Sequence, residues 1–116
     1  MREEVLEEML EITKSLKERK IQLQKTSELI NDTWNKINPL AFEEEKKVYS
    51  SEVKMTEKDK EFNIKYNKYH NDEIQLLMKD INSFNIQVDV LKIEISDLEL
   101  QFKAYRTAYG VVVSDY

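Results

Sequence analysis

The sequence predicts an all-α protein, an antiparallel helical hairpin that is extended by a long heptad coiled-coil helix. Apolar residues recur at helical spacing along most of the chain. Charged residues make up 35% of the 116 positions, and there is one glycine and one proline. Average soluble domains have about 25% charged residues and about 7% glycine. We therefore expect long solvated helices with few turns, with residues 1–109 as one domain and 110–116 as a short tail.

The first predicted helix covers residues 3–37. Its first turns are rich in acids, including Glu3 and Glu4, which the positive end of a helix dipole favours. Its apolar residues form a stripe with a repeat of seven: Met9, Leu16, Leu23, Ile30 and Ile37.

The single proline, Pro39, predicts the turn of the hairpin. Asn38 is a preferred N-cap residue, and proline is favoured at the first position of a helix. Ile37 and Phe42 then occupy the two positions of a hydrophobic staple. A second helix is therefore predicted to begin at Pro39 and to pair antiparallel with the first helix through its own stripe, Val48, Met55, Phe62 and Tyr69.

The polar stretch Tyr66–Glu73 shifts this stripe by one residue. Such a shift is typical of a stutter in a continuous helix, or of a short break that Asn71 or Asp72 would cap. The absence of glycine and proline from the stretch favours a continuous helix to residue 109. A break there gives the alternative fold, a monomeric three-helix bundle.

The C-terminal third carries a heptad seam in which the spacing alternates between three and four residues, as in coiled coils. In a continuous helix this seam has no partner within the chain, so we expect it to bind another chain and make the protein an oligomer. The seam consists of Ile74, Leu77, Ile81, Phe84, Val88, Leu91, Ile95, Leu98, Phe102, Tyr105 and Tyr109.

A second apolar row lies on the opposite face of the same helix. A helix that is apolar on both faces is usually sandwiched between others, which favours a bundle of more than two helices. The row consists of Ile86, Val90, Ile93 and Leu100. Beyond it, Gly110 is typical of a residue just past a helix end, and Val111–Val113 predict a short β-strand.

The sequence offers little chemistry for catalysis. There is no cysteine, and a single glycine cannot form a phosphate-binding glycine-rich loop. His70 is the only histidine and has no glutamate three residues before it, unlike di-iron bundles. We therefore expect no enzyme activity, no cofactor and no metal.

Charge and hydropathy restrict the partners. The net charge of −5 disfavours nucleic acid and anionic membranes. No apolar run approaches the roughly 18–20 residues that span a bilayer, and the acidic N-terminus lacks a signal-peptide core. We expect a soluble intracellular protein that binds proteins.

The predicted function is a structural or assembly role through homo-oligomers or heterotypic coiled coils. The alternative is a small helical binding module, such as an export chaperone or adaptor, that shields a partner helix.

Overall fold

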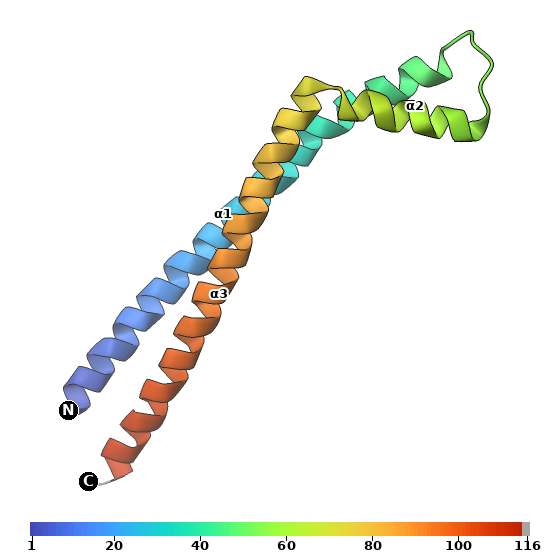
Figure 1. Cartoon of the computed structure of the whole chain (residues 1–116). Helices are drawn as coiled ribbons and strands as arrows, with labels where there is room; N and C mark the ends of the chain where they lie inside the picture. Colours follow the sequence, from blue (N-terminus) through green and yellow to red (C-terminus); the bar gives the residue numbers. More distant parts are fainter. Residues whose placement is uncertain (115–116) are drawn as a thin grey trace. The chain divides into compact units, whose positions relative to one another are not determined.

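The structure is a computed structural model that describes the backbone of residues 1–114 and the side chains of residues 1–111. It has three α-helices in these residues: α1 (Arg2–Tyr49), α2 (Glu57–Tyr69) and α3 (Asp72–Ser114) (Figure 1). No strand occurs within the described range. The predicted all-α class is confirmed.

The predicted turn at Asn38–Pro39 is wrong, because α1 continues through Pro39 to Tyr49. Ile30 and Val48, one residue from each of the two predicted stripes, lie on this one helix about 27 Å apart along its axis and cannot meet. Ile37 and Leu40, on either side of Pro39, pack into the same hydrophobic cluster. Packing on both sides of the proline outweighs capping preferences, which contribute about 1 kcal/mol.

The chain reverses instead at residues 50–56. The segment contains one residue of the predicted stripe, Met55, and Thr56 provides a side-chain cap for the next helix. Its hydroxyl accepts a hydrogen bond from the backbone N–H of Asp59 at 3.1 Å. A capped start of this kind satisfies one of the free N–H groups at the beginning of α2.

The helix also breaks at His70 and Asn71, so the prediction of a continuous helix across Tyr66–Glu73 is wrong and the alternative break is confirmed. Asn71 supplies the local reason for the break. Its Oδ1 accepts a hydrogen bond from the N–H of Ile74 at 3.0 Å, and its carbonyl accepts one from Gln75 at 3.0 Å. Asn71 is therefore the N-cap of α3.

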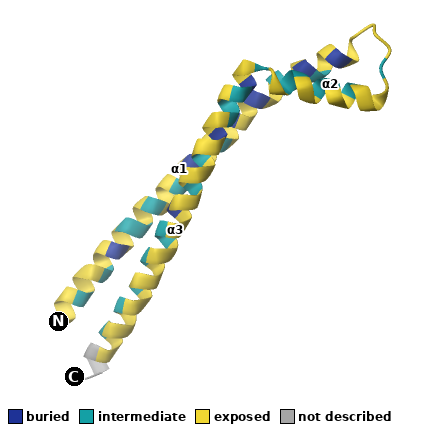
Figure 2. Cartoon of the chain, in the orientation of Figure 1, coloured by how far each residue is buried: buried dark blue, intermediate teal, exposed yellow. Residues whose placement is uncertain are grey.

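The chain divides into two compact units, to both of which α1 and α3 contribute. Unit 1 comprises residues 1–27 and 86–116, and Ile12 and Leu91 are its buried apolar side chains among the described residues. Unit 2 comprises residues 28–85 and has a core of Ile37, Ile74 and Ile81. Buried residues recur at intervals along α1 and α3, and α2 has none (Figure 2).

The predicted strand at Val111–Val113 is wrong, since α3 runs through Gly110 to Ser114. Gly110 does not adopt the positive φ angle of a residue that ends a helix. A helix satisfies its own backbone hydrogen bonds, whereas a strand needs a neighbouring strand. No such strand exists in the described residues, and the last two tail positions, 115–116, lie outside them.

Candidate protein interface

The predicted seam is the inner face of α3. Ile74, Ile81 and Leu91 are buried, and the other eight seam residues are half-buried. In unit 2, Ile74 and Ile81 pack with Ile37 of α1, and Leu77 lies against this cluster. The premise that the seam has no partner within the chain is therefore wrong in unit 2. Binding of the seam to another chain stays a prediction.

The structure identifies a matching seam on α1. The residues that line it have reduced exposure and alternate in spacing between four and three: Val5, Met9, Ile12, Leu16, Arg19, Leu23, Thr26, Ile30, Thr33, Ile37, Leu40 and Glu44. The predicted stripe from Met9 to Ile37 is one position of this heptad, and the second position was not predicted because Arg19, Thr26 and Thr33 occupy it. The alternating spacing was the signal that could have revealed it.

The two threonines of the α1 seam form hydrogen bonds within α1. Thr26 donates its hydroxyl hydrogen to the carbonyl of Gln22 at 2.8 Å, and Thr33 donates to Leu29 at 2.7 Å. Such bonds to the preceding turn allow threonine to be buried in a helix. Within the described residues, no buried side-chain nitrogen or oxygen lacks a partner.

Ion pairs connect α1 and α3 beside the seams of unit 1. Arg19 pairs with Glu94 at 2.5 Å, and Lys20 with Glu99 at 3.9 Å. Both pairs are partly exposed, so each contributes at most about 1 kcal/mol. They define the register between the two helices more than they stabilise it.

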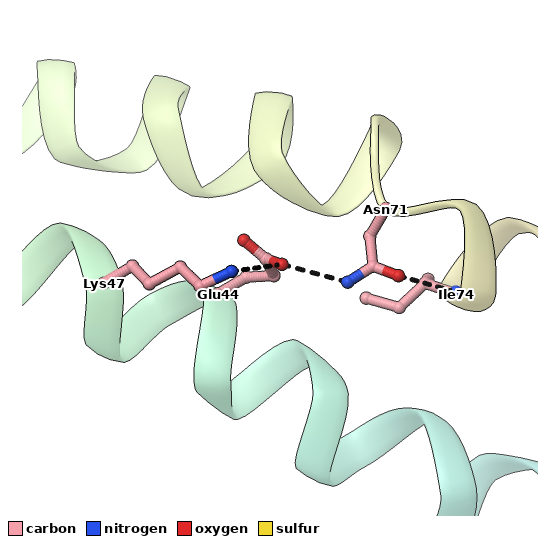
Figure 3. Close-up of polar contacts among 4 residues, drawn as sticks. All are labelled: Glu44, Lys47, Asn71 and Ile74. Atoms are coloured by element: carbon pink, nitrogen blue, oxygen red, sulfur yellow. Dashed lines mark hydrogen bonds and ion pairs between the residues drawn. The ribbon is translucent and has the colours of Figure 1, made fainter.

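A polar cluster joins α1 to the break between α2 and α3 (Figure 3). The nearly buried Glu44 carboxylate accepts hydrogen bonds from Asn71 Nδ2 at 2.9 Å and from Lys47 Nζ at 3.2 Å. The Asn71 hydrogen bond, aided by Lys47, lowers the pKa of Glu44 against the opposing effect of burial. Asn71 thus binds Glu44 while it caps α3, which makes this cluster structural.

His70 packs against aromatic residues of α2. Its ring lies against Tyr66, with 4.2 Å between centroids, and edge-on to Tyr69 at 5.2 Å. The described residues contain no group of three or more His, Cys, Asp or Glu side chains that could hold a metal ion.

The aromatic residues of α2 lie on its solvent face. Phe62, Tyr66 and Tyr69 are exposed, and the rings of Phe62 and Tyr66 stack at 6.4 Å. The prediction that Phe62 and Tyr69 belong to a packed stripe is wrong. The less exposed face of α2 contains Ile64 with Asn63 and Asn67 instead. The misplaced turn at Pro39 caused the error, because it assigned the wrong partner helix.

The second apolar row lies on the outer face of α3. Ile86, Val90, Ile93 and Leu100 are 65%, 48%, 63% and 65% exposed. Four more exposed residues continue the same four-three spacing, one inside the predicted row and three beyond it: Asp97, Ala104, Thr107 and Val111. We call these eight residues the outer row of α3. It is a second heptad seam on a helix whose inner seam packs within the chain.

A groove runs beside this row in unit 1. Ile86, Val90 and Leu91 of α3 form its apolar wall. Its volume is about 630 Å³, and the α1 wall consists of Arg19, Gln22, Lys25 and Thr26. The outer row and the groove lie side by side on unit 1 and both contain exposed apolar side chains.

None of the described helices has a stretch that is both long and apolar enough to cross a membrane. Comparison with known proteins found no match to this chain among protein-family models, curated proteins or solved structures.

Proposed function

We propose that this chain is a non-catalytic coiled-coil protein that mediates protein–protein association through the outer row of α3. The observation that carries the proposal is the exposure of four large aliphatic side chains, Ile86, Val90, Ile93 and Leu100, in one row. Rows at this spacing bind the apolar face of another amphipathic helix. Exposed apolar residues aligned in one row mark protein interaction sites more often than single scattered ones do.

The expected affinity follows from the exposure of the row. Complete burial of an exposed aliphatic side chain contributes about 1.5–3 kcal/mol. The four residues are half to two-thirds exposed, so each contributes about 1–2 kcal/mol and the row about 4–8 kcal/mol. Loss of translational and rotational freedom costs about 4–15 kcal/mol. The apolar row therefore supports reversible binding that depends on further polar contacts.

Site-specific photo-crosslinking tests the proposal. A photoreactive phenylalanine analogue is placed at Ile93, in the outer row, and in a matched variant at Lys92, which is exposed on another face of α3. The chains are expressed in the cells that naturally produce the protein. We expect adducts with a polypeptide from position 93 and few from position 92. Equal yields at the two positions, or no adduct from position 93, would refute the proposal.

A further inference from the structure

We infer that the partner of the α3 outer row is the outer face of α1 in a second copy of this chain. This inference rests on the proposed function and names the partner of the same surface. Two rows of unit 1 would form this interface. One is the outer row of α3, and the other is the outer row of α1, which we define as Leu10, Lys14, Lys17 and Ile21.

The outer row of α3 has an acid at its centre. Asp97 is exposed, and within the described part of the chain it forms no ion pair. A carboxylate in a helix–helix interface must meet a cation, because an unpaired buried charge is costly. The row therefore requires a partner helix with a lysine or arginine at the facing position.

Two α3 rows do not meet this requirement. In a parallel pair each Asp97 would face the Asp97 of the second copy, and Asp89 would lie beside Glu94. In an antiparallel pair that overlaps the whole row, Asp97 would face Leu100 and the two carboxylates would occupy adjacent layers. Like charges across an interface act against a partner, so pairing of α3 with itself is disfavoured.

The outer row of α1 has the complementary composition. Leu10 and Ile21 are 57% and 42% exposed, and two lysines lie between them at the same alternating spacing. Lys17 forms no ion pair within the described residues. Lys14 pairs only with Glu11, at 3.6 Å, and both side chains are largely exposed. Such a pair is weak and easily exchanged.

An antiparallel register brings the two rows together. With Lys17 opposite Asp97, Ile21 lies opposite Ile93 and Leu10 lies opposite Ala104, since equal rise per residue keeps the layers aligned. Lys14 then covers Leu100 with the aliphatic part of its side chain. This single register therefore gives one charged pair and two apolar pairs.

The two rows give each copy two different binding faces. Each outer row lies on the face of its helix opposite the inner seam, so one copy can bind a neighbour through α3 and another through α1. An interface between two different surfaces leaves one free row at each end and does not close by twofold symmetry. The expected assembly is an open row of copies whose mass rises with concentration.

Mixing of two blocked variants tests the inference. I93D disables the α3 row and I21D disables the α1 row, and both sites are exposed, so the fold should persist. We expect each variant alone to sediment as a monomer in analytical ultracentrifugation. In an equal mixture the intact α1 row of I93D can bind the intact α3 row of I21D. The mixture should therefore form dimers and no larger assembly. The matched control is L29D, an exposed leucine of α1 that falls on neither row, and it should assemble like wild type.

A charge exchange tests the facing pair. D97K should weaken association at least about tenfold, because it places two cations opposite each other. The double variant D97K/K17E should recover association, because it restores opposite charges at the same place.

The inference fails if wild type is monomeric, if I21D alone forms dimers, if the mixture stays monomeric, or if the double variant does not recover. An adduct between position 93 and a different protein would then leave the proposed function intact and refute self-assembly alone.

Discussion

Replacement of Asn71 by serine should reveal how much the contact between the α3 cap and Glu44 stabilises the fold. Serine caps helices about as well as asparagine but is too short to reach the Glu44 carboxylate. The variant therefore retains the bond to Ile74 N–H and loses the 2.9 Å bond to Glu44. A hydrogen bond to a charged group contributes about 1.5–3 kcal/mol. We expect a loss near the lower limit, because Lys47 still binds the carboxylate.

Urea unfolding followed by circular dichroism at 222 nm gives the free energy of unfolding. N71A should cost about 1 kcal/mol more than N71S, because alanine also removes the cap. N82S is the matched control, since Asn82 is exposed on α3, and its effect should stay within about 0.5 kcal/mol.

A double-mutant cycle decides the interpretation. In an E44A background, N71S has no carboxylate to lose and should cost little. If N71S costs as much in E44A as in wild type, or no more than N82S, the contact between Asn71 and Glu44 does not stabilise the fold and the reasoning is refuted.

Three further predictions follow from other parts of the structure. A carboxylate with a lowered pKa stabilises the fold above its ordinary value of 4.5, and this contribution disappears as the pH falls through the folded pKa. The difference in unfolding free energy between wild type and E44Q should thus be largest near neutral pH and should shrink below pH 4.5. A difference that stays constant down to pH 3 would contradict this prediction. P39A should stabilise the protein by about 2 kcal/mol in the same urea assay. Proline inside a helix destabilises the fold by about 3 kcal/mol, and its rigidity in the unfolded chain stabilises the fold by about 1 kcal/mol. Destabilisation by P39A would place Pro39 at a helix start. I81A should lower the free energy of unfolding by about 2–4 kcal/mol, because Ile81 is 3% exposed. I93A should lower it by less than about 1 kcal/mol, because Ile93 is 63% exposed. Similar losses in the two variants would contradict the assignment of inner and outer faces.

Periodicity alone located the two faces of α3. Every residue of the predicted seam is buried or half-buried, and every residue of the predicted second row is exposed. This success has a physical reason. Which residues share a face depends only on the pitch of the helix, and a heptad of large aliphatic residues specifies one face without knowledge of its partner. Seam residues such as Ile81 and row residues such as Ile93 could therefore be separated in advance.

The same periodicity did not identify the partner of each face. The predicted turn at Pro39 gave the first helix the wrong partner, since Arg19 pairs with Glu94 of α3. Any two heptad stripes can be aligned in antiparallel register, so the choice depends on where the chain reverses. The predicted row left out Asp97 and the positions beyond Leu100, because Asp97, Ala104 and Thr107 are not large apolar residues.

The amino-acid sequence by itself determined the all-α class, the inner seam of α3 and the apolar row on its outer face. These features arise from composition and from spacing within one helix, which are local properties. Only the tertiary structure decided that α1 continues through Pro39, that the chain reverses at residues 50–56, and that a break at Asn71 separates α2 from α3. Local capping signals contribute about 1 kcal/mol each, and similar signals occur at both Asn38 and Asn71. Asn71 forms a cap because Glu44 of α1 binds its side chain, and Asn38 does not because Ile37 and Leu40 pack together in the core of unit 2.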